Sequence, residues 1–184
     1  MTCRPPNPEN PKLMTATEIF SRLNGPHASE ILNWLAENDR NAYKSAAGML
    51  ATRRKLRPVF VERKPKDERN QWIKESLSRP SNVDLALEIL QVWTLGSNER
   101  MVCEFLDALN IAHNGRGLID NLPSEPAADK VAEAVELLIS KYPAQAVFVY
   151  LHLFSSMDSQ GWTTLRALLA SHPELSVEKV FSLS

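Results

Sequence analysis

Apolar residues recur along most of the chain at intervals of three and four positions, which places them on one face of an α-helix. Turns rich in Gly, Pro, Asn and Asp separate these amphipathic segments, and most of the turns are short. Short connections make consecutive helices antiparallel neighbours. The spacing predicts helices that include residues 28–35, 43–50, 72–77, 83–90, 102–109, 131–138 and 165–169.

Side chains that can bond to free backbone amides mark where several helices start. Thr15-Ala-Thr-Glu18 has the Ser/Thr-x-x-Glu pattern of a capping box. Asp39 and Asp67 each precede an apolar-periodic segment and are expected to be helix caps. Gly96-Ser97-Asn98 is expected to be a turn, and residues 110–126, with their Gly, Pro and Asn residues, are expected to form the longest loop.

The segment from Ala144 to Met157 fits two structures. Its run of β-forming residues from Val147 to Phe154 could be a buried strand. A single strand would leave its backbone donors unpaired, however, and Pro143 suits the first turn of a helix. We therefore predict a central helix, apolar on nearly all sides and surrounded by the others.

One further β-prone piece, Val59-Phe60-Val61, follows Arg57-Pro58, where the third helix is expected to end. We expect an all-α fold: a compact right-handed array of antiparallel helical hairpins with about eight helices and no significant sheet. The pattern Ala-x-Glu-[Ile/Leu]-Leu begins at Ala28, Ala86 and Ala134, and the second interval approaches the period of a HEAT-like repeat. A hairpin stack without repeats would give the same pattern.

Composition and charge divide the chain into regions. Residues 1–13 contain four prolines and no apolar periodicity, which predicts a disordered tail. We expect an N-terminal helical subdomain over residues 14–64, with a basic C-terminal end, and a C-terminal helical bundle over residues 65–184. The net charge of the whole chain is −1, but residues 1–79 carry 15 basic and 9 acidic side chains and residues 80–184 carry 6 and 13. Such asymmetry is typical of a charged binding face.

Several classes of protein are disfavoured by the composition. The two cysteines, Cys3 and Cys103, are far apart and lack the spacing of a zinc ribbon or a redox pair. The longest apolar run, residues 146–154, is too short for a membrane span, and the start of the chain has no apolar signal segment. We therefore expect a cytoplasmic protein with no membrane partner and no cofactor.

The densest group of cations lies between residues 40 and 69, and it is the main candidate site. Helix 26–37, the turn Asn38-Asp39 and helix 40–55 could form a helix-turn-helix, with residues 59–61 as part of a wing. The cations are numerous enough to neutralise several phosphates. The candidate nucleic-acid contacts are Arg40, Lys44, Arg53, Arg54, Lys55, Arg57, Arg63 and Lys64.

The alternative is that the same cations stabilise the fold and bind no ligand. Arg53, Arg54 and Lys55 end a predicted helix, where cations stabilise the helix dipole without any ligand. The sequence pI of about 6.4 is low for a dedicated nucleic-acid domain.

Two histidines are candidates for a chemical role. His113, with Asp107 and Asp120, could form a metal or acid-base site, but a position after a helix end also favours a role in capping. His152 lies in the apolar helix and is expected to be a core residue bonded to the backbone or to a polar side chain. The four tryptophans lie on apolar helix faces and are expected to be core residues first.

Known linear motifs for phosphate binding, nucleophilic catalysis and metal binding are absent from the sequence. The leading expectation is therefore a non-catalytic helical module that binds another protein or a second copy of itself. The alternative is a nucleic-acid-binding protein that uses the basic 40–69 region, and an enzyme built around His113 or His152 is a third hypothesis.

Overall fold

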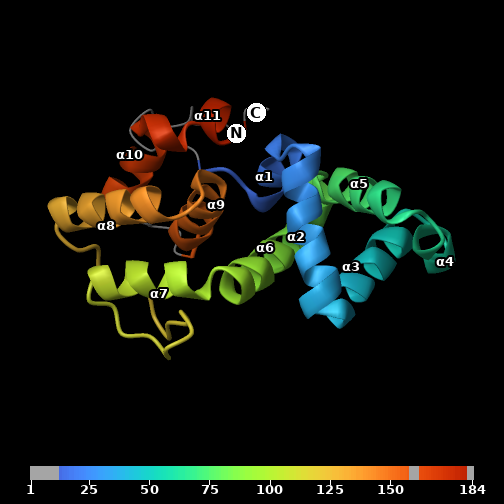
Figure 1. Cartoon of the computed structure of the whole chain (residues 1–184), viewed down its shortest axis with the longest axis horizontal. Coiled ribbons are helices and arrows are strands. Elements are labelled where there is room, and N and C mark those ends of the chain that lie inside the picture. Colours follow the sequence, from blue (N-terminus) through green and yellow to red (C-terminus); the bar gives the residue numbers. More distant parts are fainter. Residues whose placement is uncertain (1–12, 158–161, 182–184) are drawn as a thin grey trace, which may run out of the picture.

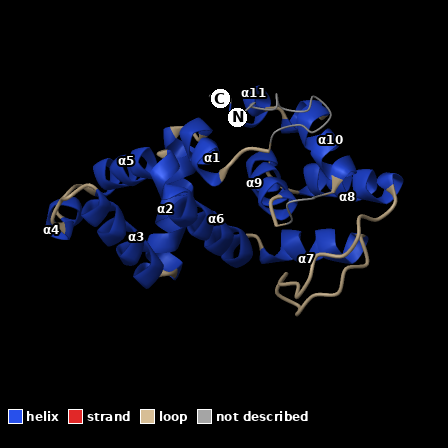
Figure 2. Cartoon of the chain, turned by 180° about the vertical axis from the view of Figure 1, so that it is seen from behind, coloured by secondary structure: helices blue, strands red, loops and turns tan. Residues whose placement is uncertain are grey.

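The computed structural model describes residues 13–157 and 162–181, and every regular element in this part of the chain is a helix (Figure 2). The all-α fold class is therefore confirmed. The predicted tail, apart from Leu13, lies outside the described residues. The α-helices are α1 (Ala16–Arg22), α2 (Gly25–Asn38), α3 (Arg40–Arg53), α4 (Pro58–Glu62), α5 (Lys66–Leu77), α6 (Val83–Ser97), α7 (Glu99–Ala108), α8 (Ala128–Lys141), α9 (Ala144–Ser155), α10 (Thr163–Ser171) and α11 (Val177–Phe181).

Two short 3₁₀-helices, η1 (Pro80–Asn82) and η2 (Pro173–Leu175), complete the described elements. About eight helices were expected and eleven α-helices are described. The periodicity did not predict α4 and α11, because a five-residue helix is too short to show a repeating pattern. The HEAT-like arrangement of the hairpins stays a prediction.

Helix α6 lies at the middle of an elongated molecule (Figure 1). Helices α1, α2 and α5 pack against it toward one end, and α7 and α9 pack against it toward the other. Helix α3 packs on α2 and α4 packs on α3, so that α4 lies at the far end of this half (Figure 1). Helices α8, α10 and α11 pack around α9 and form the opposite end.

Three helices begin with the side-chain caps that their sequences favour. The Thr15 hydroxyl accepts a hydrogen bond from the Glu18 amide, and the Glu18 carboxylate accepts one from the Thr15 amide, which confirms the capping box. Asn24 caps α2, and Asp39 accepts a hydrogen bond from the Ala42 amide at 3.0 Å. Asp67 is not a cap, because α5 begins one residue earlier, at Lys66.

The central helix predicted from residue 144 is confirmed. All side chains of α9 from Gln145 to Ser155 are buried. The Phe105 ring of α7 meets the rings of Tyr150 and Phe154 edge to face, with centroids 5.5 and 5.3 Å apart. Aromatic edge-to-face pairs add stabilisation beyond the burial of their area. This helix organises the core of the second half of the molecule.

The predicted β-prone piece at residues 59–61 is wrong, because these residues form most of α4. Pro58 occupies the first turn, where its fixed φ favours a helix and its missing amide hydrogen costs nothing. The wing of a helix-turn-helix is therefore absent from the described residues. β-Branched residues form a stable strand only where a neighbouring strand can pair with them, and the described residues contain no strand.

Other boundaries also differ from the sequence pattern. Helix α3 ends at Arg53, before the predicted stop at Arg57-Pro58. Helix α6 continues through the expected turn to Ser97. Val83, expected in the core, is the first residue of α6 and is 45% exposed, since the chain enters this helix through η1. The loop expected after α7 is confirmed, because no helix lies between Ala108 and Ala128.

Candidate functional site

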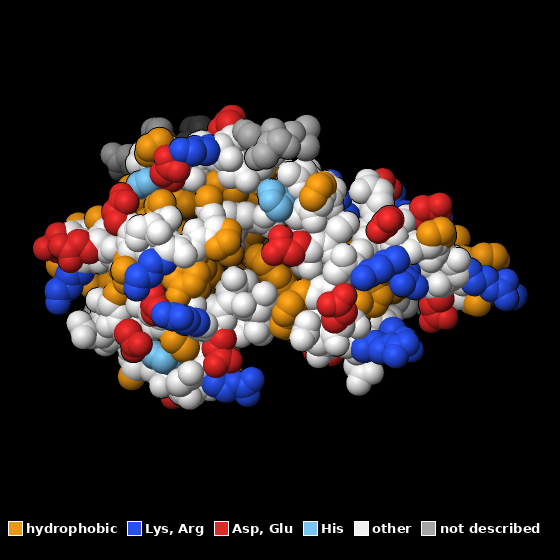
Figure 3. Space-filling model, viewed as in Figure 1, with side chains coloured by type: hydrophobic (Ala, Val, Ile, Leu, Met, Phe, Trp, Pro, Cys, Tyr) orange, Lys and Arg blue, Asp and Glu red, His pale blue; other side chains and the backbone are white. Residues whose placement is uncertain are grey.

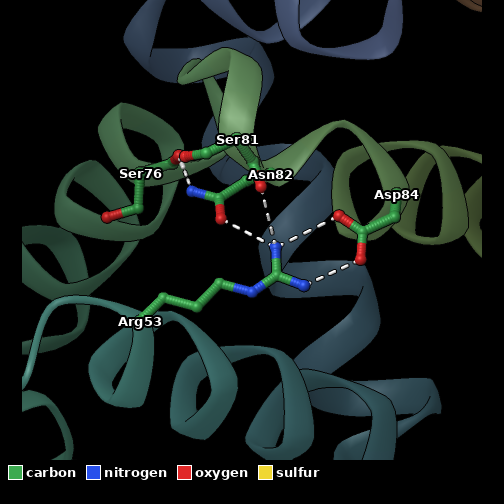
Figure 4. A network of polar contacts seen from close by, with 5 residues as sticks. All are labelled: Arg53, Ser76, Ser81, Asn82 and Asp84. Atoms are coloured by element: carbon green, nitrogen blue, oxygen red, sulfur yellow. Dashed lines mark hydrogen bonds and ion pairs between the residues drawn. The ribbon is translucent and has the colours of Figure 1, made fainter.

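The side chain of Arg53, one of the predicted contacts, is held by three groups at the start of α6 (Figure 4). Its guanidinium donates from Nη1 and Nη2 to the two carboxylate oxygens of Asp84, at 3.1 and 2.7 Å. It also donates to Asn82 Oδ1 at 2.8 Å and to the Ser81 carbonyl. The hydrogen bond from Arg53 is the main reason why the pKa of Asp84 falls to about 2. The charge of Arg53 is therefore already paired.

Two further predicted contacts also have partners within the chain. The Arg54 guanidinium carbon lies 5.0 Å from the centre of the Trp72 ring, a cation–π geometry, and the side chain is partly buried. Lys64, between α4 and α5, has its Nζ 3.7 Å from a carboxylate oxygen of Glu68 in the first turn of α5. Arg53, Arg54 and Lys64 thus already have partners within the chain, and for the first two these partners are side chains and a carbonyl of other elements.

The other five predicted contacts have exposed side chains that make no hydrogen bond or ion pair with any described residue. Arg40 and Lys44 lie on the first turns of α3, and Lys55 and Arg57 lie between α3 and α4. Arg63 follows α4 directly. Unpaired cations on a surface favour an anionic partner. These five side chains are Arg40, Lys44, Lys55, Arg57 and Arg63.

Large apolar side chains are exposed beside these cations. Among the described residues, four of the seven exposed large hydrophobic side chains lie between residues 49 and 60, and Phe60 is 59% exposed. The sequence patterns did not predict that these side chains are exposed. Helix α4 has only five residues and buries only Val61, so the side chains of Val59 and Phe60 stay in contact with solvent. In Figure 3, orange and blue side chains lie next to each other at this end of the molecule. We name Met49, Leu56, Val59 and Phe60, together with the five unpaired cations, the α3–α4 surface.

The backbone at the end of α3 projects this surface outward. Lys55 has a φ of 57°, and the Leu56 amide donates to the Ala51 carbonyl at 2.9 Å, which is a Schellman ending. Glycine usually occupies this left-handed position because a side chain costs about 1 kcal/mol there. A lysine at this position keeps a cation beside Leu56 and Arg57 at a cost in stability.

Gly48, in the middle of α3, lies between two hollows of the α3–α4 surface. A cleft of about 350 Å³ on one side is lined by Arg40, Lys44 and Arg69 among others, and by one carboxylate, that of Glu62. A shallower groove of about 450 Å³ on the other side is lined by Met49 and Pro58 among others. A Cβ added to Gly48 would meet no atom within 4 Å. The glycine therefore leaves open space on the outer side of α3.

Arg69, which was counted in the basic segment but not among the contacts, lines the cleft in a fixed position. Its Nε donates to the Tyr43 hydroxyl at 3.0 Å, and its Nη1 donates to the Glu62 carbonyl at 3.2 Å. Tyr43 in turn donates to the buried Asn70 at 2.9 Å. These bonds position one guanidinium at the wall of the cleft before any ligand binds.

The two helices and the short turn of the predicted helix-turn-helix are present, although the wing is not. Helix α2 is followed at once by the Asp39 cap and α3, and Arg40, Asn41, Lys44 and Ser45 are all exposed on the first turns of α3. The residues that a recognition helix would use are thus accessible.

The two histidine candidates have structural partners. His113 lies 3.1 Å from Asp107 through Nε2 and accepts from the Gly115 amide through Nδ1. Buried His152 lies with Nδ1 2.9 Å from the Phe148 carbonyl, as expected for a core histidine. No group of three or more His, Cys, Asp or Glu side chains within residues 13–157 and 162–181 could hold a metal ion.

No described helix combines the length and the apolar character needed to cross a membrane. No family model matches the chain, and neither a curated protein nor a solved structure gives a significant match. A function can therefore be inferred only from the chemistry of the molecule itself, above all that of the α3–α4 surface.

Proposed function

We propose that the chain is a non-catalytic helical interaction module, and that its α3–α4 surface binds an acidic, partly apolar segment of another protein. The observation that carries this proposal is the combination of exposed Phe60, Val59, Leu56 and Met49 with five unpaired cations. Aromatic and apolar anchors supply most of the affinity of protein interfaces, and charges around them direct the partner.

Gly48 in α3 is compatible with a partner whose side chains enter the cleft and the groove on either side of it. An alanine would fit at position 48 and would stabilise the helix by about 1 kcal/mol. The glycine leaves the boundary between the cleft and the groove without a side chain. An amphipathic helix with acidic residues beside its apolar face fits such a surface, because apolar anchors can enter the groove while carboxylates meet Arg40 and Lys44.

A different protein is favoured over a second copy as the partner. The acidic side chains of this chain lie mostly in residues 80–184, and α8, with exposed Asp129 and Glu133, lies at the opposite end of the molecule from α4 (Figure 1). Contact between these two unlike ends would be heterologous, so it would continue into an open filament unless it closed into a ring.

Fluorescence anisotropy with defined probes tests the proposal. The first probe is a labelled helical peptide in which Leu recurs every three and four positions and Glu fills the remaining ones. We expect saturable binding that weakens as salt rises, since charges contribute to it. Phe60→Ser, and separately the pair Arg57→Glu and Arg63→Glu, should each weaken binding by about tenfold or more.

Matched control substitutions distinguish a specific role of the α3–α4 surface from general effects of losing an apolar side chain or reversing a charge. Val83→Ser removes an apolar side chain of similar exposure at another place, and the pair Arg22→Glu and Lys130→Glu reverses two exposed cations outside the α3–α4 surface. These variants should bind the peptide like the unchanged chain. Equal weakening by the controls, or no binding of the acidic peptide, would overturn the proposal.

Nucleic-acid binding is the second candidate function, and the exposed first turns of α3 are the observation that favours it. A labelled random duplex at low salt is the second probe. Duplex binding that is lost in the pair Arg40→Glu and Lys44→Glu, with no binding of the acidic peptide, would replace the first proposal with this one. The pairing of Arg53 with Asp84 leaves fewer cations for phosphates than the sequence indicated.

A further inference from the structure

The cleft of about 350 Å³ on one side of Gly48 carries an excess of positive charge. Among the described residues, four charged side chains line it: Arg40 and Lys44 from α3, Arg69 from α5 and Glu62 from α4. Three cations and one carboxylate give the wall of the cleft a net charge of +2. One carboxylate of a ligand would neutralise half of this charge, whereas a phosphomonoester carries a charge of about −1.5 to −2 at neutral pH. The charge of the cleft therefore matches a phosphomonoester.

One of the three cations is held in place by a polar network that reaches three other helices. Arg69 Nε donates to the Tyr43 hydroxyl of α3 at 3.0 Å, and its Nη1 donates to the Glu62 carbonyl of α4 at 3.2 Å. The Tyr43 hydroxyl donates to Asn70 Oδ1, and Asn70 Nδ2 donates to Asn33 of α2, each at 2.9 Å. Two of the five guanidinium N–H groups are thus used, and three remain for a ligand. A guanidinium fixed in this way loses little side-chain freedom when it binds.

The other two cations of the cleft are free to turn toward a ligand. Arg40 and Lys44 lie one helical turn apart on α3, and their exposed side chains make no hydrogen bond or ion pair with any described residue. A phosphoryl group has three strong acceptor oxygens, so it can bond both of them and Arg69 at once. Arginine also binds phosphate oxygens in pairs, which favours this group further.

The cleft adjoins the groove that is proposed to take apolar side chains. Gly48 and Pro58 line both hollows, and exposed Val59 and Phe60 follow Pro58 in α4. A peptide can therefore place a phosphorylated side chain in the cleft and apolar side chains beside it. Each phosphodiester of a nucleic acid carries only one negative charge, which matches the cleft less well. A volume of about 350 Å³ is small for a ligand site, which suits a short side chain such as phosphoserine.

We infer that the cleft binds the phosphoryl group of a phosphorylated serine in the acidic, partly apolar segment that docks on the α3–α4 surface. This inference rests on the function proposed above and adds a modification of the partner that strengthens binding. Arg69 bonds the phosphoryl group from a fixed position, and Arg40 and Lys44 bond it from α3. The carboxylate of Glu62 opposes binding through like-charge repulsion. Phosphorylation of the partner then acts as a switch for the interaction.

Anisotropy titrations of the full chain with modified peptides test this inference. In the labelled helical peptide of Leu and Glu, each Glu in turn is replaced by phosphoserine, so that one peptide of the set brings its phosphoryl group to the cleft. We expect at least one phosphopeptide to bind about tenfold more tightly than the unmodified peptide, because the group adds charge-assisted hydrogen bonds. The same peptide with unphosphorylated serine should show no such gain.

Substitutions in and beside the cleft should change this gain in different directions. The pair Arg40→Gln and Lys44→Gln should remove most of it, since two of the three cations are lost. Glu62→Gln should increase it by about two- to fivefold, because the repulsion is removed. Arg63→Gln is the matched control, since Arg63 follows Glu62 and belongs to the α3–α4 surface but does not line the cleft. It should weaken the phosphopeptide and the unmodified peptide equally and leave the ratio of their affinities unchanged.

The possible results distinguish this inference from the proposed function. Binding of the unmodified peptide with no gain from phosphoserine at any position overturns the inference alone. Absence of binding by every peptide overturns both. A gain that persists in the Arg40→Gln and Lys44→Gln pair overturns the cleft as the phosphoryl site. If a random DNA duplex displaces the labelled phosphopeptide at a lower concentration than the unlabelled phosphopeptide does, the cleft belongs to nucleic acid, which also overturns the inference.

Discussion

Gly48 and Gly96 show how the surroundings of one residue type decide what it contributes. Both lie inside helices, where glycine is less favourable than alanine by about 1 kcal/mol. A Cβ on Gly48 would stand in open space, whereas a Cβ on Gly96 would lie 2.2 Å from the Trp34 ring. Gly96 therefore allows α6 and α2 to approach each other, and Gly48 serves no packing purpose.

The contrast predicts opposite effects of the same substitution. Gly48→Ala should raise the free energy of unfolding by about 0.5–1 kcal/mol, because it restores helix propensity without a clash. Gly96→Ala should lower it by about 1–3 kcal/mol, because the Trp34 ring must move. Urea denaturation of the two variants measures both values. A loss of stability in Gly48→Ala would show that the space beside α3 is filled in solution.

At the residue scale, the sequence predicted the side-chain interactions between residues that are close together in the chain. The Thr15 cap bonds three residues ahead, and the Nδ1 of His152 lies beside a carbonyl four residues back, so local spacing was sufficient for both. The partner of Arg53 is 31 residues away, and no periodic pattern connects it to Asp84. The cations of residues 40–69 could be counted from the sequence, but which of them were already paired could not.

At the scale of elements, Arg53 and Asp84 connect the end of α3 to the start of α6 (Figure 4). The same guanidinium bonds Asn82, whose side-chain amide donates to the Ser76 carbonyl at the end of α5 at 2.7 Å. Three elements are thus joined through one charged group. Because the carboxylate of Asp84 is stabilised in the folded chain, its titration is linked to stability.

This link predicts an acid-sensitive step in stability. Asp84 has an ordinary pKa of 3.8 and a folded-state pKa of about 2, so the unfolded chain takes up its proton first as the pH falls. The contribution of the pair is present above pH 3.8 and is lost as the pH falls through about 2. Urea unfolding across this range should show it, and Asp84→Asn should remove that part of the pH dependence. An unchanged profile in Asp84→Asn would contradict the pairing.

The elements themselves were predictable where they are long. Helices such as α2 and α8 show a full pattern of buried and exposed positions, which periodicity detects. Helix α4 was not predictable, because three of its five residues are β-branched or aromatic and its helical form depends on Pro58 and on packing against α3. The exposed Phe60 of the candidate site lies in that helix, so the error concealed the apolar part of the site.

At the scale of the whole molecule, α6 joins two halves of opposite charge. The buried apolar side chains of the described residues form one cluster that includes members from both halves, such as Phe20 and Leu151. The predicted boundary at residue 65 falls between α4 and α5, yet α5 packs against α1 and α2. The net charges of the two halves were readable from the sequence, but the shared core was not, since it depends on contacts between distant helices.

Continuity of the core through α6 predicts that the two halves unfold together. Leu151 in α9 is fully buried, so Leu151→Ala should cost about 2–5 kcal/mol through the cavity it leaves. If unfolding is cooperative, the slowest amides of α2, which lies in the other half, should lose protection from hydrogen exchange by the same factor as those of α9. Loss of protection confined to α7–α11 would contradict cooperative unfolding. The amides of α5 would then show directly which half it belongs to, and so where the boundary between independently folding units lies.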